Sequence, residues 1–283
     1  MQGTMNDKTY WRWRVEVPAE RADGVCGWVR AELGEEPVCC LEPESPVAMV
    51  DVYFGTEAGA LAAAARVEGS TVERIGEERW TGFWKDHFRA TPIGRTLQTV
   101  PVWEEPPDNG RLSIRIDPRL SFGTGSHFTT RFCLETLEDS VAELHPESMV
   151  DAGAGSGILS IAAALLGVPD IEGFDLDPAS VERCRANAAL NNLPPDRIRF
   201  RQLDIHDWHP SGPCDIVCAN ILSGILADCA QTLWNATARH LVLSGIRFQE
   251  ADGIIGIFTS LGARLLRHGT DREWSGLLFA HGV

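Results

Sequence analysis

The residues best suited to chemistry lie in a glycine-rich segment, Asp151–Leu159, which reads DAGAGSGIL. A short apolar run precedes its alternating glycines, and a longer apolar run follows them. Glycine adopts backbone angles that other residues avoid, and it lets a ligand approach the main chain closely. In an open α/β sheet, ligands bind at such turns, where the strands end. We therefore expect this loop to hold a ligand; the alternative is a turn that only packs a helix against a strand.

The spacing of the glycines narrows the class of ligand. A dinucleotide fingerprint needs glycines at its first, third and sixth positions. Here the third glycine, Gly157, stands at the fifth position, and Ile158 occupies the sixth. This spacing favours the looser loop that holds a nucleoside methyl donor, and it disfavours an NAD-dependent oxidoreductase.

A carboxylate at the end of the next strand supports a nucleoside ligand. Asp175 follows the loop by about twenty residues, at the place where an acidic residue accepts hydrogen bonds from both ribose hydroxyls. Asp177 directly precedes Pro178 and is better explained as the N-cap of the following helix. For Asp175, the alternative is a second capping or turn carboxylate.

Two further positions have polar groups suited to ligand binding. Asn220 follows an apolar strand, and its amide has the donors and the acceptor needed to orient a methyl donor or an incoming amine. Its alternative role is an Asx-turn. The hydroxyls of the segment 117–130 either cap a helix expected from about Thr129 to Leu137 or face a ligand. In the same segment, His127 is expected to have a structural role near the helix start; the alternative is a base.

The segment Asp204–His209 combines two aspartates with two histidines. It lies in an expected loop with no further cluster of ligands, so we do not predict a metal site. Asp204 follows the third strand of the pattern and is a candidate contact for adenine. The eight cysteines show no spacing typical of a metal knuckle, and we expect reduced thiols.

The charge and hydropathy of the chain limit its partners. Asp and Glu outnumber Lys and Arg by 40 to 25, so the formal net charge is −15. This charge opposes nucleic acid as the primary ligand and favours a cationic, lysine-rich protein; solubility alone is the alternative. No apolar stretch reaches the ~20 residues that span a bilayer. We expect a soluble, cytoplasmic protein with no membrane partner.

The elements that position these residues form a regular pattern after residue 149. Short apolar strands alternate with helices, which predicts a parallel, doubly wound sheet. The strands are expected at Met149–Asp151, Ile171–Asp175, Ile198–Leu203, Asp215–Ala219 and His240–Ser244, with two more in the tail. The helices are expected at Ile158–Leu166, Pro178–Asn191, Ile225–Ala238 and Gln249–Leu261.

The first part of the chain has a different order, βαββαβ, which is typical of a small split-βαβ domain. Its strands are expected at Trp11–Val17, Val38–Leu41, Val47–Phe54 and Thr71–Ile75, and its helices at Ala22–Leu33 and Glu57–Val67. An aromatic helix at Glu77–Phe88 and strands at Thr96–Trp103 and Leu112–Asp117 are expected between the two parts.

With these residues identified, the chain resembles the PrmA family, the methyltransferases of ribosomal protein L-eleven. The resemblance extends from about Arg79 to the C-terminus. The Gly-Thr-Gly segment with its histidine and paired threonines is its most specific part, although the family has threonine and proline where this chain has Ser126 and Phe128. The matching segments are Trp80–Phe88, Phe122–Thr130, Asp151–Leu159, Asp175–Pro178, Asn220–Leu222, Leu243–Ile246 and Glu273–Trp274.

The resemblance implies a fold, a cofactor and a set of contacts. The fold is α/β: a doubly wound, Rossmann-like methyltransferase sheet at 96–283 preceded by a linker helix at 77–95. A small ferredoxin-like α+β domain at 1–76 recognises the substrate. The cofactor is S-adenosylmethionine, and the cofactor-binding residues fall on Thr130, Gly153, Gly155, Asp175 and Asn220.

The implied reaction is methylation of amino groups, on lysine side chains or at the N-terminus, of the ribosomal protein L-eleven, a basic protein. One alternative is a lysine methyltransferase that acts on another protein, such as an electron-transfer flavoprotein subunit. An alternative of a different class is a non-catalytic nucleoside-binding module. No residue is identified as a general base.

Overall fold

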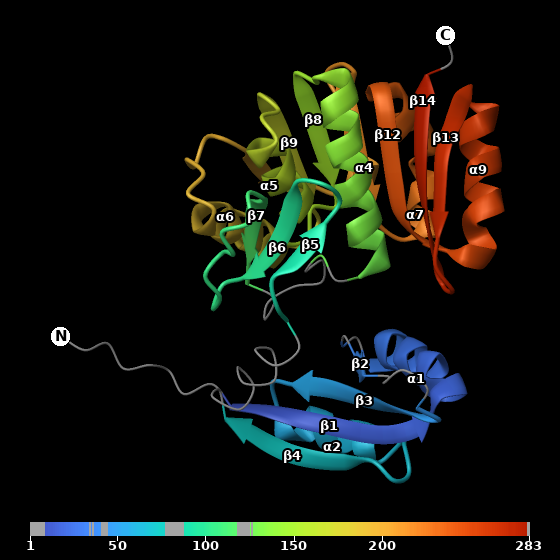
Figure 1. Ribbon diagram of the computed structural model, residues 1–283. Coiled ribbons are helices and arrows are strands. Elements are labelled where there is room, and N and C mark those ends of the chain that lie inside the picture. The colour runs from blue at the N-terminus through green and yellow to red at the C-terminus, as the bar shows by residue number, and fades with distance from the viewer. Residues whose placement is uncertain are drawn as a thin grey trace. The chain divides into compact units, whose positions relative to one another are not determined.

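The computed structural model describes residues 9–33, 35, 37–40, 45–76, 88–117, 125 and 127–281. Two compact units divide the chain, one at Met1–His87 and the other at Phe88–Val283 (Figure 1). The linker helix expected at 77–95 lies, up to residue 87, outside the described residues. It does not reach residue 95, because Thr91–Ile93 form strand β5. Pro92 and the β-branched residues beside it disfavour a helix there.

The N-terminal unit has the predicted order of elements. Its four-stranded sheet has the order β2-β3-β1-β4, and every neighbouring pair is antiparallel. This is the ferredoxin-like arrangement that the resemblance implied. The helix expected at Ala22–Leu33 is α1 followed by a π-helical turn, Val29–Leu33. The elements are β1 Thr9–Pro18, α1 Ala22–Trp28, β2 Val38–Cys40, β3 Val47–Phe54, α2 Glu57–Ala64 and β4 Thr71–Gly76.

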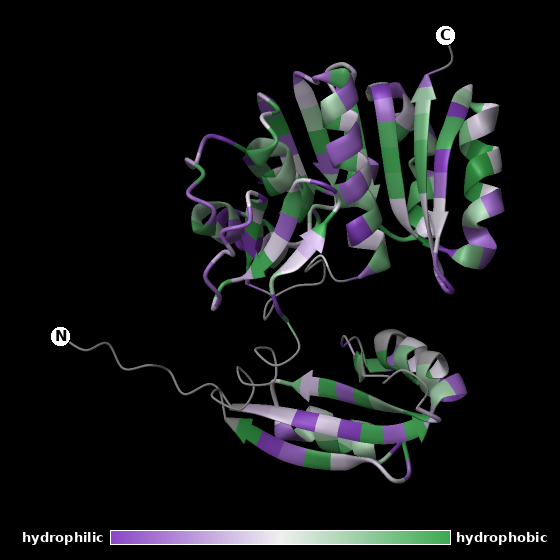
Figure 2. Cartoon of the chain, viewed as in Figure 1, coloured by the Kyte–Doolittle hydropathy of each residue, from purple (hydrophilic) through white to green (hydrophobic). Residues whose placement is uncertain are grey.

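Strand β1 shows why this sheet forms. Its alternate residues Trp13, Val15 and Val17 are buried in the core of the unit, as the period of two along a strand requires. Arg12 and Arg14 point to the other face, and hydropathy therefore alternates along the strand (Figure 2).

The C-terminal unit is built on a seven-stranded sheet of order β10-β9-β8-β11-β12-β14-β13. The five strands from β10 to β12 are parallel, as predicted. Strand β14 departs from this parallel arrangement and is antiparallel to both neighbours. A tight turn joins it to β13, and such hairpins pair antiparallel strands. The strands are β8 Ser148–Ala152, β9 Asp170–Asp175, β10 Arg199–Gln202, β11 Cys214–Asn220, β12 Thr237–Arg247, β13 Ala263–Thr270 and β14 Trp274–His281.

Helices cover both faces of this sheet and form two apolar cores. Residues of α4, α5 and α6 share one core with Ile216 and Cys218, whereas α7, α8 and α9 share the other with Val217 and Ala219. Successive residues of β11 from Ile216 to Ala219 thus face opposite layers, which is why this part of the strand is apolar. The helices are α4 Phe128–Leu144, α5 Ile158–Leu165, α6 Pro178–Leu190, α7 Ser223–Asp228, α8 Ala230–Asn235 and α9 Ala251–Ser260.

Some boundaries differ from the predictions. The helix expected at Ile225–Ala238 is two short helices, α7 and α8, and Thr237 already belongs to β12. The hydroxyl of Thr237 donates to the carbonyl of Leu233 and closes the end of α8. Helix α4 continues to Leu144, beyond the expected end at Leu137.

A small three-stranded sheet precedes α4 in the same unit. It has the order β5-β6-β7, with β5 antiparallel and β7 parallel to β6. Its strands are β5 Thr91–Ile93, β6 Leu97–Pro101 and β7 Leu112–Ile116. Strand β5 was not predicted, because it is only 3 residues long.

Two expectations from composition concern the described residues. None of the helices in the described ranges is long and apolar enough to cross a membrane. Among the described residues, Cys133, Cys184, Cys214, Cys218 and Cys229 carry free thiols.

Candidate cofactor site

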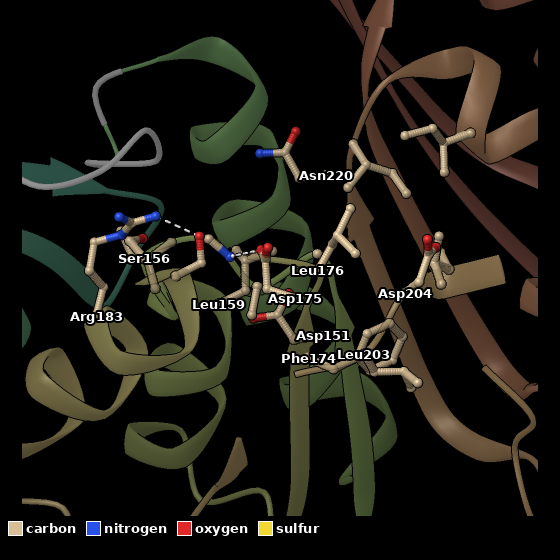
Figure 3. Close-up of a pocket in the computed structure, with 18 of the residues that line it drawn as sticks. Asp151, Ser156, Leu159, Phe174, Asp175, Leu176, Arg183, Leu203, Asp204 and Asn220 are labelled. Carbon is tan, nitrogen blue, oxygen red and sulfur yellow. Dashed lines mark hydrogen bonds between the residues drawn. The ribbon is translucent and has the colours of Figure 1, made fainter. Parts of the chain in front are cut away.

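A cavity of about 390 Å³ opens at the carboxyl ends of β8, β9 and β11 (Figure 3). Its walls include all five residues that were predicted to bind the cofactor: Thr130, Gly153, Gly155, Asp175 and Asn220. They come from four segments that are distant in sequence. Parallel strands bring these segments to one edge of the sheet, because each strand ends where its neighbour ends.

Two backbone hydrogen bonds hold the glycine loop against strand β9, and a third lies within the loop. The amides of Gly153 and Ala154 both donate to the carbonyl of Phe174, at 2.9 Å each. The amide of Gly157 donates to the carbonyl of Ala154 at 2.7 Å. The loop turns because Gly153, Gly155 and Gly157 have φ of 78°, 56° and 78°, a region that favours glycine.

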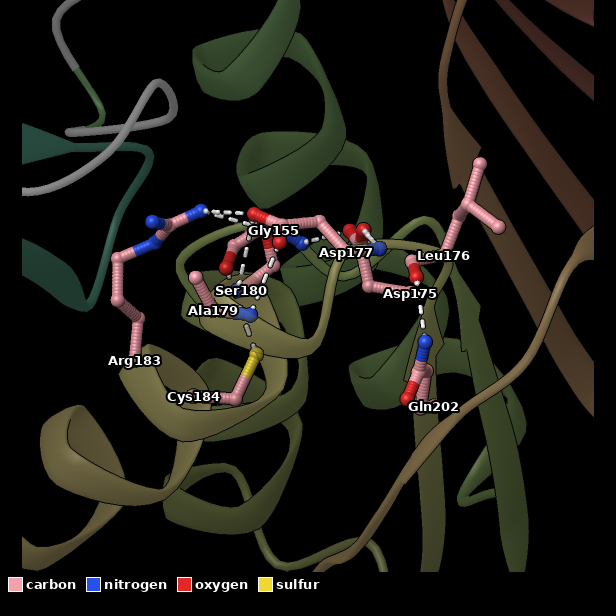
Figure 4. A network of polar contacts seen from close by, with 9 residues as sticks. All are labelled: Gly155, Asp175, Leu176, Asp177, Ala179, Ser180, Arg183, Cys184 and Gln202. Atoms are coloured by element: carbon pink, nitrogen blue, oxygen red, sulfur yellow. Dashed lines mark hydrogen bonds and ion pairs between the residues drawn. The ribbon is translucent and has the colours of Figure 1, made fainter.

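The carboxylate of Asp175 lines the cavity and takes part in a network of hydrogen bonds (Figure 4). One oxygen accepts from the amide of Gly155 at 2.9 Å, and the other accepts from the amide of Asp177 at 3.0 Å. Each carboxylate oxygen has a second lone pair, and the side chain is half-buried. Asp175 therefore both fixes the loop and retains acceptor capacity toward the cavity.

Asp177 caps helix α6, as predicted. Its carboxylate accepts from the amides of Ala179 and Ser180, at 2.9 Å and 3.2 Å. The bond from the amide of Ala179 is the main cause that lowers the pKa of Asp177, against the opposing effect of desolvation and with smaller contributions from the Ser180 hydroxyl and from Arg183. Arg183 donates to Asp177 at 3.1 Å and also lines the cavity (Figure 4).

Thr130 and Asn220 meet across the cavity. The amide nitrogen of Asn220 donates to the hydroxyl of Thr130 at 3.5 Å. The threonine is buried, and the asparagine is half-buried. The cap of α4 comes from the histidine of this segment, since the Nδ1 atom of His127 accepts from the amide of Thr129. Its ring packs edge-on against Trp274 at 5.4 Å, a structural role as expected.

A second carboxylate, that of Asp151, lines the same cavity. It is 1% exposed, and Ser160 donates to it through both its amide and its hydroxyl, at 3.1 Å and 2.7 Å. The pKa of Asp151 is raised to about 6, mainly by burial and to a smaller extent by the nearby charge of Asp175, against the opposing effect of these hydrogen bonds.

Another part of the cavity wall is apolar, and most of its residues were not predicted from the sequence. Asp204 lines it, but its carboxylate also accepts from the amide of His206 at 2.9 Å and caps a short 3₁₀ turn. The apolar side chains form a slot suited to a flat aromatic ring. These apolar residues share one feature that could have identified them in the sequence, since each stands within a few residues of a strand end. They are Phe174, Leu176, Leu203, Ile205, Ile221 and Ile225.

Metal ligation finds no support in the described ranges. No group of three or more His, Cys, Asp or Glu side chains there is arranged to hold a metal ion. His206 instead pairs with Asp204 at 2.8 Å.

The cavity fits S-adenosylmethionine. This molecule has a ribose with two hydroxyls, a flat adenine and a positively charged methionyl part. Asp175 offers acceptors for the hydroxyls, the apolar slot offers a place for the ring, and the acidic side chains suit the positive charge. The fold and this site define the class of the protein as an S-adenosylmethionine-dependent methyltransferase.

Comparisons with known proteins place the chain within that class. The family model described as "Ribosomal protein L11 methyltransferase (PrmA)" matches residues 47–281, so the chain belongs to this family. The match begins inside the N-terminal unit and extends further than the resemblance seen in the sequence.

Individual relatives agree with the family model. The ribosomal protein L11 methyltransferase of Geobacter metallireducens is 37% identical over 244 residues, which cover 85% of this chain and 79% of the relative. That of Azotobacter vinelandii is 39% identical over 204 residues, covering 71% and 68%. The crystal structure of a ribosomal protein L11 methylase from Lactobacillus delbrueckii subsp. bulgaricus is 29% identical with a TM-score of 0.62, and the match covers 69% of this chain and 99% of that chain.

Proposed function

We propose that this enzyme transfers methyl groups from S-adenosylmethionine to amino groups of ribosomal protein L11, on lysine side chains or at the N-terminus. The names of its relatives support this substrate. The observation that carries the proposal is the cavity in which the glycine loop, Asp175, Thr130 and Asn220 meet.

We further assign a role to each predicted site residue. The backbone of Gly153 and Gly155 faces the methionyl and ribose parts of the cofactor, and Asp175 accepts the ribose hydroxyls. Thr130 and Asn220, which contact each other, border the reacting end. Asp204 at the apolar slot is the candidate partner of the adenine amino group.

The chemistry requires a neutral amine, because a protonated lysine has no lone pair. With an unperturbed pKa near 10.4, freeing the amine at pH 7 costs about 4–5 kcal/mol. Desolvation at the cavity lowers this cost, and the side-chain oxygen of Asn220 can accept a hydrogen bond from the neutral amine. The rest of the catalysis is positioning of nucleophile and methyl group in line. No side chain in the described ranges is assigned as a general base.

The partner is proposed to be a basic protein. The formal charge of −15 favours the approach of a cationic substrate. The N-terminal unit, with its ferredoxin-like sheet, is the proposed substrate-recognition domain, and the cytoplasm is the expected location.

A transfer assay with labelled S-adenosylmethionine tests the substrate. Purified ribosomal protein L11 of the same organism should gain label, and L11 with all its amines acetylated should not. A whole lysate in which the label goes to a different protein would support the alternative substrate, such as an electron-transfer flavoprotein subunit. Cofactor binding without label in any protein would support the non-catalytic alternative.

A further inference from the structure

A buried asparagine on helix α6 connects the glycine loop to a distant strand. Asn187 is 3% exposed. Its side-chain nitrogen donates to the carbonyl of Ser156 at 2.8 Å, and its side-chain oxygen accepts from the amide of Asp117 at 3.2 Å. The first partner belongs to the glycine loop, and the second directly follows β7.

The three-stranded sheet is held at two places by the helices that flank the cavity. At β7, Asn191 exchanges two hydrogen bonds of 2.8 Å with the backbone of Arg115. At the β5–β6 turn, Glu138 of helix α4 accepts from the amides of Arg95 and Thr96, at 2.7 Å and 2.5 Å. Helix α4 also carries Thr130 into the cavity. The sheet therefore links α4 to α6, and β7 packs beside α6 (Figure 1).

The glycine loop needs such external contacts because of its composition. Each glycine has more backbone conformations available than any other residue, so an untethered loop loses more entropy when a ligand orders it. The loop has tethers on the side of β9, from Phe174 and Asp175. On the side of α6, Asn187 holds the carbonyl of Ser156, and Ser156 itself lines the cavity.

We propose that Asn187 is a positioning residue of the cofactor site, which joins the glycine loop to β7 and holds the loop in its ligand-binding conformation. This inference rests on the assignment of the cavity to S-adenosylmethionine. Asn187 is not among the lining residues of the cavity, so it acts through Ser156 and not by direct contact.

Asn191 provides a matched control on the same helix. It is bonded to the same strand through Arg115, but not to the loop. Asn187→Ala and Asn191→Ala should each lower the free energy of unfolding, because each leaves backbone groups of β7 unpaired. Only Asn187→Ala should weaken binding of S-adenosylhomocysteine, by about tenfold in isothermal titration calorimetry, whereas Asn191→Ala should stay within about twofold.

Asn187→Asp supplies a signature that general destabilisation does not produce. A neutral carboxyl group donates through its hydroxyl to Ser156 and accepts from Asp117, as the amide does; the ionised form cannot donate. The affinity of Asn187→Asp relative to the wild type should therefore recover as pH falls through the pKa of the new carboxyl group, which burial raises.

The result separates the two proposals. Equal weakening by Asn187→Ala and Asn191→Ala, or a ratio that does not change with pH, would overturn the positioning role while the cofactor assignment stands. Failure of the wild-type protein to bind S-adenosylhomocysteine would instead overturn the cofactor assignment.

Discussion

Replacement of Asp175 by alanine perturbs the cofactor site at its centre. The carboxylate accepts from the amides of Gly155 and Asp177, and its remaining lone pairs face the cavity. Alanine removes two charge-assisted hydrogen bonds to the ribose, each worth about 1.5–3 kcal/mol. Their sum, about 3–6 kcal/mol, corresponds to a rise of about 10²–10⁴-fold in the Kd of the cofactor. The loss of the Gly155 contact loosens the loop and adds to this effect.

Isothermal titration calorimetry with S-adenosylhomocysteine measures the change, and Asp177→Ala is the matched control. Asp177 lies two residues away and caps α6, so its removal should cost about 1 kcal/mol of stability. Its cofactor affinity should nevertheless stay within about threefold of the wild type. An Asp175→Ala protein that folds and binds the cofactor as tightly as the Asp177→Ala protein would refute the assignment of the ribose contact.

Three further changes test the site. Gly153→Ala places a methyl group 2.4 Å from Ile221 at a φ of +78° and should weaken cofactor binding, measured by calorimetry. Gly167→Ala is the control, because Gly167 has a φ of +96° and open space around it. The backbone strain at each of the two positions should cost ~1–2 kcal/mol of stability, and Gly167→Ala should leave cofactor binding unchanged. Asn220→Ala should lower the kcat of methyl transfer by about 10–100-fold in a radiometric assay. Burial raises the pKa of Asp151 from 3.8 to about 6. The stability of the wild type should therefore decline relative to that of Asp151→Asn as the pH rises from the pKa of the unfolded state to that of the folded state. Denaturant titrations should show a decline of at most about 3 kcal/mol.

The parts of the site that lie at strand ends were predictable from the sequence. Gly153, Asp175 and Asn220 each follow a short apolar strand, and parallel strands place such positions at one edge of the sheet. Their convergence in one cavity follows from the order of elements alone. Thr130 was different: its hydroxyl had two equal roles on physical grounds, and only the family resemblance favoured the cofactor.

Other features depend on contacts that leave no local pattern. The reversed direction of β14 arises from the turn at Asp271, whose carboxylate accepts from the amides of Glu273 and Trp274; strand direction is not encoded in hydropathy. Asn187 has an ordinary position within a helix, and its partner Asp117 lies 70 residues earlier in the chain. Such a link becomes visible only when the three-dimensional structure brings the two segments together.

The central claim concerns the substrate, and intact-protein mass spectrometry of ribosomal protein L11 tests it most directly. L11 purified from cells that contain this enzyme should be heavier, by whole multiples of a methyl group, than L11 from cells that lack it. Restoring the wild-type enzyme should restore the added mass, and restoring Asp175→Ala should not. An L11 of identical mass in both kinds of cell would contradict the claim.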